Sequence, residues 1–448
     1  MSARRTGVVV LAAIVVVALA AFAWIVTVPG PMAFAHGPKV ALGDYRAADP
    51  AGVPADLAQA SLVQRGEYLT RAADCMACHT ARGGQPYAGG LAFTLPFGAL
   101  YSTNITPDKE TGIGGYSDAD FLNVMHRGVR RDGARLYPAM PFTSYTAVTD
   151  ADALAIKAYL FTLAPVHAPA RADTLAFPFD QRWLMGVWST LFNADKRFEP
   201  VPSQSPQWNR GAYLAEALAH CGECHTPRNL AYALDNRKKF GGAVTAGWRA
   251  YNISGDKGTG IGGWSDDQVF AYLANGHAMG HGTATGPMGE AVDDSLSQLA
   301  PSDLHALATY LRSVPGTASP DLPATLASPA PESHRQGGAV ADTSGKRIFA
   351  GACASCHNWS GVSPITPLAT LTGARAVNDP SAINVAQVVI SGAERRTQDA
   401  VSMPAFGNAY SDAEIAAVAN YVTARFGSKP SAITEKDVAN LRKQTSQP

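Results

Sequence analysis

The stretch Cys75-Met-Ala-Cys78-His79 recurs in this chain as Cys221-Gly-Glu-Cys224-His225 and as Cys353-Ala-Ser-Cys356-His357. Residues three apart on a helical turn lie on one face, so the two thiols of each copy can reach the same flat group. The C-x-x-C-H pattern is typical of covalent c-type haem attachment, with the adjacent histidine as an axial ligand of the iron. The three copies therefore predict three haem-binding segments.

A redox dithiol or half of a zinc site also begins with C-x-x-C, so a single copy would leave these alternatives open. All six cysteines of the chain fall within the three complete copies, and none remains for a disulfide or a separate zinc site. We therefore expect three covalently bound haem c groups. The attachment residues are Cys75, Cys78, Cys221, Cys224, Cys353 and Cys356, and the axial histidines are His79, His225 and His357.

Length and charge agree with this organisation. A chain of 448 residues predicts about three domains by ordinary domain size, which equals the number of motif copies. Apolar residues make up 46% of the chain, enough for each unit to bury a core. Lys and Arg together number 36, as do Asp and Glu, so no basic excess points to nucleic acid and none is expected as a partner.

An uncharged run from Gly7 to Val28 follows Arg4 and Arg5. As a helix this run would extend about 33 Å, enough to cross a bilayer core of about 30 Å. The upstream arginines favour an N-inside orientation, with everything downstream exported. A cleaved signal peptide is the alternative, with Ala33-Phe34-Ala35 as the cleavage site before His36, but the run is longer than ordinary secretory apolar regions. We expect a retained anchor in the bacterial inner membrane and haem domains in the periplasm.

Composition divides the chain into a mainly α-helical series of three tandem units. The expected segments are a signal anchor at 1–35, a tether at 36–60, unit 1 at 61–168, an aromatic linker at 169–204, unit 2 at 205–316, a Pro/Ala/Ser linker at 317–342, unit 3 at 343–428 and a polar tail at 429–448. Within the aromatic linker, the run Trp183–Phe192 is too short to span a membrane. It either packs between units 1 and 2 or contacts the membrane surface or a partner.

A long internal repeat links units 1 and 2. Residues 101–118 match residues 251–266, and Gly112 aligns with Gly260 at an offset of 148. The glycines predict tight turns where the backbone runs close to a flat group such as a haem edge. Ser117 and Ser265 are expected to cap helices at 118–127 and 266–275. Each unit then closes with an amphipathic helix, and these helices begin near Asp150, Ser302 and Ser411.

Methionine is the common sixth ligand of an electron-transferring c-type iron, although a methionine can also be core filler. Met140 and Met403 each lie beside proline in a loop before the last helix of units 1 and 3. In unit 2 the same offset of 148 leads from Met140 to Met288, which we choose as the ligand. Met279, His277 and His281 lie in the same loop and remain alternatives.

These motifs together resemble a known family. Three C-x-x-C-H units behind an export segment, the T-G-I-G-G-[YW]-S-D element and the Tyr137-Pro-Ala-Met140-Pro loop are similar to the triple-haem cytochrome c subunit of bacterial membrane-bound alcohol, gluconate, sorbitol and aldehyde dehydrogenases. The resemblance covers about residues 61–425. It implies three class I cytochrome c-like domains and a separate dehydrogenase catalytic subunit, of quinoprotein, flavin or molybdenum type, as electron donor. Ubiquinone or a terminal oxidase of the respiratory chain would accept the electrons.

The residues themselves point the same way. The chain contains no G-x-S-x-G elbow, and a candidate methionine in every unit fills the second axial position. We therefore expect no catalytic residue in this chain and an electron-transfer subunit that is not catalytic alone. The alternatives are a free-standing membrane-anchored electron carrier to a terminal oxidase and a multihaem peroxidase or reductase, which would need one open iron.

Overall fold

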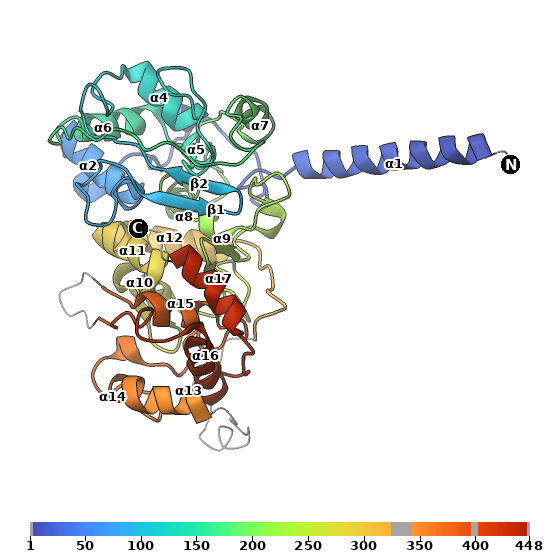
Figure 1. Cartoon of the computed structure of the whole chain (residues 1–448). Helices are drawn as coiled ribbons and strands as arrows, with labels where there is room; N and C mark the ends of the chain where they lie inside the picture. Colours follow the sequence, from blue (N-terminus) through green and yellow to red (C-terminus); the bar gives the residue numbers. More distant parts are fainter. Residues whose placement is uncertain (1–2, 324–342, 396–401, 446–448) are drawn as a thin grey trace.

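The computed structural model describes residues 3–323, 343–395 and 402–445, so most of the predicted Pro/Ala/Ser linker lies outside the described residues. Helices dominate, and the strands in these ranges form antiparallel two-stranded hairpins. Helix α1 (Ala3–Val26) projects away from the rest of the chain (Figure 1). In the described part it is the one helix long and apolar enough to cross a membrane, and its apolar window Gly7–Val26 buries no residue against the protein.

Unit 1 begins with a capped helix and ends with another. Its elements are α2 (Leu62–Ala72), α3 (Cys75–Cys78), β1 (Ala92–Leu95), β2 (Gly98–Tyr101), α4 (Asp118–Arg127), α5 (Phe142–Tyr145) and α6 (Asp150–Leu160). Ser117 caps α4 with a reciprocal hydrogen-bond pair to Asp120, which confirms the predicted cap. Helix α7 (Leu184–Phe192) lies in the predicted aromatic linker, between units 1 and 2 in sequence.

Unit 2 repeats this order with small additions. Its elements are α8 (Pro206–Tyr213), the π-helical turn η3 (Leu214–Leu218), α9 (Gly222–His225), β3 (Ala243–Thr245), β4 (Trp248–Ala250), α10 (Asp266–Asn275), β5 (His277–Ala278), β6 (Gly282–Thr283), α11 (Gly286–Asp294) and α12 (Pro301–Ser313). Ser265 caps α10, again as predicted. The closing helix α12 begins at Pro301, one residue before the predicted Ser302.

Unit 3 is longer than the sequence predicts. Its elements are α13 (Thr343–Ile348), the π-helical turn η7 (Phe349–Cys353), α14 (Ala354–His357), α15 (Ile383–Ser391), α16 (Asp412–Phe426) and α17 (Glu435–Thr445). The expected polar tail contains α17, which packs against α15 and α16. Val438 and Leu441 on α17 are buried, so this segment completes the core of unit 3 and does not trail as a polar tail.

The first and last helices of each unit cross at a glycine. Helix α2 packs on α6, α8 on α12 and α13 on α16. A Cβ atom added at the glycine of each crossing would lie within 2.2 Å of a carbonyl oxygen in the facing helix, and the pairs are Gly66 with Ala155, Gly211 with Ala306 and Gly345 with Ala417. Since any other residue would force the helices apart, the crossing requires glycine. The same contact therefore organises all three units.

Units 1 and 2 share one hydrophobic core, and two buried carboxylates bind them together. Tyr68 on α2 donates to Asp303 on α12 at 2.6 Å, and Tyr213 on α8 donates to Asp152 on α6 at 2.6 Å. Arg210 adds two hydrogen bonds to Asp303, at 2.8 and 2.6 Å. The two units thus exchange equivalent tyrosine–aspartate bonds, which fixes them as one rigid body.

Unit 3 has a separate core and is joined to unit 2 by polar contacts. Arg395 and Asp293 form an ion pair of 2.7 Å in which both side chains are buried. Gln387 on α15 donates to the carbonyl of Gly247 at 2.8 Å, and Asn384 exchanges two hydrogen bonds with the backbone of Arg249. Unit 3 therefore docks through α15 onto the β3–β4 hairpin of unit 2.

The predicted tether at 36–60 is a packed strap. Val40 hydrogen-bonds the carbonyl of Pro200 at 3.1 Å, and Arg210 donates to the carbonyls of Pro50 and Gly52. Apolar residues of the segment pack against the shared core of units 1 and 2. The Pro-, Gly- and Ala-rich composition suggests a flexible spacer, but the strap's partners lie far away in sequence and leave no local signal.

The repeated glycine element forms tight turns, as expected, but the close neighbour is the chain itself. A Cβ atom at Gly112 would lie 2.2 Å from the carbonyl oxygen of Thr106, and one at Gly260 would lie 2.4 Å from that of Ser254. Asp108 accepts hydrogen bonds from the amide and hydroxyl of Thr111, which ties the first turn together. The close approach of the element's own backbone therefore requires glycine at both positions.

Candidate haem sites

In units 1 and 2 the cysteine motif follows a kink that separates it from the first helix of the unit, whereas in unit 3 the motif continues that helix. Asp74, immediately before α3, has φ +50°, and His220, before α9, has φ +36°. In unit 3 the π-helical turn η7 leads directly into α14. In units 1 and 2 the backbone therefore turns just before the motif and sets the direction of its thiols.

The three motif histidines are fixed in the same way. The Nδ1 atoms of His79, His225 and His357 hydrogen-bond the backbone carbonyls of Thr103, Tyr251 and Ala369 at 2.7, 2.6 and 2.6 Å. A carbonyl accepts, so Nδ1 carries the proton and Nε2 keeps a lone pair. Burial lowers the pKa of all three imidazoles, which favours the neutral form that ligates metals. This is the arrangement of an axial ligand oriented by its second nitrogen.

The six cysteines are free thiols in the described structure. Burial raises the pKa of Cys75, Cys78 and Cys221 to about 12, and that of Cys224 and Cys353 to about 11. Four of the six cysteines are partly buried, and Cys224 and Cys356 are exposed. The paired thiols are placed where both could attach to one group that covers the motif.

Met140 and Met288 occupy equivalent places in their units. Helices α4 and α10 end at glycines with φ +60° and +68°, Gly128 and Gly276. The chain then doubles back, with Val129 paired to Arg135 in unit 1 and His277 paired to Thr283 in unit 2. Each methionine follows the second member of its pair by five residues. Both methionines pack, partly buried, against the core that also holds Cys75 and Cys221.

Met403 has a comparable position in unit 3. It exchanges backbone hydrogen bonds with Ala393 at 2.8 and 2.9 Å, just after α15 ends. Its side chain packs, partly buried, against the unit 3 core, and so does Cys353. Met403 therefore lies on the same core as the unit 3 motif, as its proposed ligand role requires.

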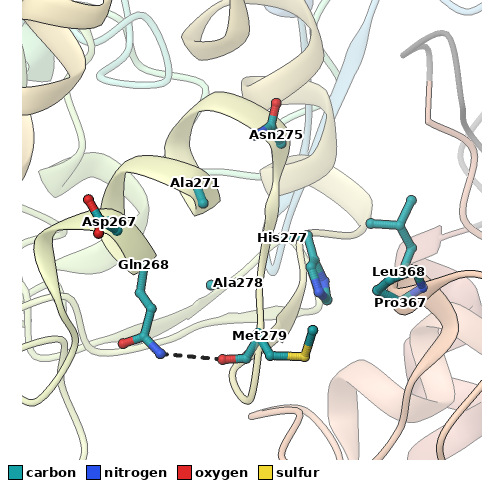
Figure 2. Close-up of a pocket in the computed structure, with 9 residues that line it drawn as sticks. All are labelled: Asp267, Gln268, Ala271, Asn275, His277, Ala278, Met279, Pro367 and Leu368. Atoms are coloured by element: carbon teal, nitrogen blue, oxygen red, sulfur yellow. Dashed lines mark hydrogen bonds between the residues drawn. The ribbon is translucent and has the colours of Figure 1, made fainter.

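The alternative ligands of unit 2 lie elsewhere. Met279 is 70% exposed and, with His277, lines an open pocket of about 430 Å³ that Pro367 and Leu368 of unit 3 complete (Figure 2). His277 Nδ1 bonds the hydroxyl of Thr283 at 2.9 Å. His281 stacks on Trp264 at 3.8 Å, and burial lowers its pKa to about 4. Of the three alternatives, Met279 is thus directed to solvent, whereas Met288 packs on the core.

Comparison with known proteins agrees with this geometry. The family model described as cytochrome c matches residues 63–164 and 343–425. The chain is 38% identical to the gluconate 2-dehydrogenase cytochrome c subunit of Pantoea cypripedii, over 87% of this chain and 91% of that protein. It is 38% identical to the fructose dehydrogenase cytochrome subunit of Gluconobacter japonicus, over 85% of this chain and 82% of that protein. This chain belongs to the family of dehydrogenase cytochrome c subunits.

A third relative of this chain is a much longer protein. A nicotinate dehydrogenase subunit of Pseudomonas putida is 42% identical over 82% of this chain, but the chain spans only 30% of that protein's length. The family resemblance read from the motifs is confirmed, and with it a covalent haem c protein that transfers electrons for a dehydrogenase. The matched ranges include the motifs of units 1 and 3.

In this cytochrome c subunit the motifs of units 1 and 2 lie beside each other. Ala73, two residues before Cys75, accepts hydrogen bonds from the hydroxyl of Tyr145 at 2.7 Å and from the ring of His220. Glu223, inside the unit 2 motif, is buried and accepts from Ser144 of unit 1 at 3.1 Å. The segments that present the two pairs of thiols are therefore in direct contact.

Sequence reasoning missed the residues that hold the sites in place. The carbonyls of Thr103 and Tyr251 orient two of the histidines, and Asp152 and Asp303 bind units 1 and 2 together. The repeat contained a signal for the first pair, since Thr103 plus the offset of 148 gives Tyr251. The aspartates also occupy matching places near the start of the closing helices.

Proposed function

We propose that this cytochrome c subunit carries three covalent haem c groups and relays electrons from a dehydrogenase catalytic subunit to ubiquinone or the respiratory chain. The observation that carries the proposal is the threefold histidine arrangement, in which Nδ1 bonds a carbonyl and Nε2 remains available. Each unit adds a methionine on the same core as its motif. These features support two filled axial positions at each iron.

In each unit, different residues would attach the haem and ligate its iron. Haem c, when bound, supplies an iron that gains and loses one electron without changing its ligands. The two cysteines would hold the group through thioether bonds, and the histidine and the methionine would ligate its iron. Because these side chains leave no open coordination site, the arrangement favours electron transfer and disfavours the multihaem peroxidase or reductase alternative.

The donor is proposed to be a separate dehydrogenase subunit of quinoprotein, flavin or molybdenum type. Its support is that relatives of this chain have the names of cytochrome subunits of gluconate, fructose and alcohol dehydrogenases. A free-standing electron carrier to a terminal oxidase has the same haem sites and remains the second candidate. The two differ in whether a dehydrogenase subunit forms a stable complex with the chain.

Purified alone, the chain is expected not to oxidise alcohols, aldehydes or sugar acids with an artificial acceptor. When the dehydrogenase subunit and its substrate are added, the haem absorption bands should shift to the reduced form. Stopped-flow spectroscopy measures the shift, and the control is the same mixture without substrate. Turnover by the isolated chain would overturn the relay, and haem reduction only by a soluble carrier would favour the free-standing alternative.

We also propose that the N-terminal segment stays attached and anchors the haem domains at the periplasmic face. This proposal is supported by the packing of residues 32–35, which cleavage before His36 would remove. Phe34 contacts the rings of Trp208 and Tyr310 at 6.3 and 6.1 Å, and Met32 and Ala35 are buried. A cleaved chain would leave this part of unit 2 uncovered.

Intact-mass analysis of the membrane-extracted protein is expected to give the full chain plus its haems. N-terminal sequencing should find residues upstream of Gly30. A mature chain beginning at His36 would show that the apolar run is a signal peptide, and attachment to the membrane would then need another element.

A further inference from the structure

Seven exposed apolar side chains form a surface that the proposed relay does not use, here called the aromatic shoulder. Its members are Phe177, Phe179, Trp183, Val187, Leu191, Leu230 and Tyr232. Leu230 is 85% exposed, Phe177 79% and Trp183 67%. Exposed apolar residues scattered singly need no explanation, but a contiguous group of this size indicates a contact surface.

Helix α7 contributes the regular part of the shoulder. Trp183, Val187 and Leu191 recur every four residues, so they share one face of the helix, and all three are exposed. On a neighbouring face, about 100° round the helix from Val187, Trp188 donates its Nε1–H to the carbonyl of Ala231 at 2.7 Å. Residues 184–192 include no charged side chain. A helix that is apolar on both faces is suited to a protein core on one side and a nonaqueous environment on the other.

Ring contacts join the segment just before α7, which contains Phe179, to the loop of unit 2 that contains Leu230 and Tyr232. Phe97, at the turn of the β1–β2 hairpin, stacks on Phe179 at 3.9 Å and meets the ring of Tyr232 edge-on at 5.5 Å. The Trp188–Ala231 bond links the same loop to α7 itself. Direct contacts therefore join the segments of units 1 and 2 that carry the shoulder.

The same loop holds the end of the membrane-spanning candidate α1. Asn229 donates to the carbonyl of Ile25 at 3.2 Å, and Arg237 donates to that of Trp24 at 2.8 Å. The guanidinium of Arg237 also lies 3.7 Å from the centre of the Trp24 ring. Figure 1 shows α7 and this part of unit 2 beside the inner end of α1. The shoulder thus surrounds the point where the chain would leave the bilayer.

We propose that the aromatic shoulder lies in the headgroup–acyl boundary of the leaflet from which α1 emerges. This inference rests on the proposed anchoring through α1. Tryptophan and tyrosine favour this boundary because one end of each ring system is apolar and the other can hydrogen-bond. With α1 and the shoulder both engaged, units 1 and 2 have a fixed orientation on the membrane and cannot swing about a single helix.

Single cysteine labels can test this placement in the full haem-loaded chain. All six native cysteines belong to haem motifs, so an introduced cysteine would be the one free thiol. A nitroxide label is attached at Val187→Cys or Leu230→Cys in protein reconstituted into phosphatidylethanolamine–phosphatidylglycerol nanodiscs. The control is Val362→Cys, an aliphatic position in unit 3 that is 49% exposed, against 56% for Val187, and Val16→Cys reports the anchor.

We expect labels at 187 and 230 to gain collisions with oxygen and to lose collisions with a water-soluble nickel complex, as the label at 16 should. The label at 362 should give the reverse. Equal nickel access at 187, 230 and 362, with 16 in lipid, would overturn the shoulder proposal and leave the anchor standing. Nickel access at 16 would overturn both. Protection at 187 and 230 that arises only when the dehydrogenase subunit is added would assign the surface to that partner instead.

Discussion

Replacing Met403 with alanine is expected to make one of the three proposed haem irons bind carbon monoxide, while the parent chain stays inert. The side chain packs on the unit 3 core, as Cys353 does, and its backbone is held by two hydrogen bonds to Ala393. Its loss would open one axial position without unfolding the unit, since the backbone bonds remain. The reduced difference spectrum with carbon monoxide should account for about one third of the haem, given three attachment motifs.

Two further variants separate ligand loss from a general effect. Met279→Ala changes a methionine whose side chain is 70% exposed, so it should leave the spectrum of the parent unchanged. Met288→Ala should open the unit 2 iron. If Met288→Ala is silent and Met279→Ala, His277→Ala or His281→Ala alters the spectrum, our ligand choice in unit 2 is wrong. An iron content of two per chain would contradict the triple-haem proposal itself.

Removing the carboxylate of Asp303 is expected to lower the free energy of unfolding by about 3–5 kcal/mol, as for other buried ion pairs that lose one partner. Asp303 is 1% exposed and accepts from Arg210 and from Tyr68 across the boundary of units 1 and 2. In Asp303→Ala the guanidinium would stay buried with only backbone carbonyls as partners. Guanidinium chloride unfolding followed by circular dichroism measures the change.

The matched control for Asp303 is a surface aspartate. Asp132 pairs with Arg130 at 2.6 Å, but its side chain is 54% exposed. Exposed pairs contribute roughly 0–1 kcal/mol, so Asp132→Ala should stay within that range. Similar losses in both variants would mean that the buried bonds do not hold units 1 and 2 together. Tyr68→Phe, which removes one hydrogen bond and keeps the ring, should fall between the two.

Local signals in the sequence led to the candidate site residues, whose ligand roles stay predictions. The motif spacing pointed to the candidate thiols and histidines, and the offset of 148 led to Met288, which follows its hairpin as Met140 does. Ser117 and Ser265 cap the helices that they were expected to cap. Each of these features depends on residues within a few positions of one another or on comparison of two copies, and a single sequence contains both kinds of information.

Features that depend on distant partners could not be read in the same way. The strap at 36–60 hydrogen-bonds residues more than 100 positions away, so its composition suggests a loose tether. Helix α17 has a polar exposed face and only a few buried apolar residues, such as Val438, so its sequence suggests a tail. Tyr68 and Asp303 lie 235 residues apart, and neither has a local feature that marks a bond.

The shared core of units 1 and 2 has a consequence for the timing of electron transfer. The segments bearing their motifs touch through Ala73, Tyr145 and His220, and the reciprocal tyrosine–aspartate bonds prevent the units from separating. Packing fixes the distance between haem groups attached to the motifs of units 1 and 2, so electron transfer between them would not wait for diffusion. That step should keep its rate in viscous glycerol solutions, whereas steps that wait for a separate partner to arrive should slow.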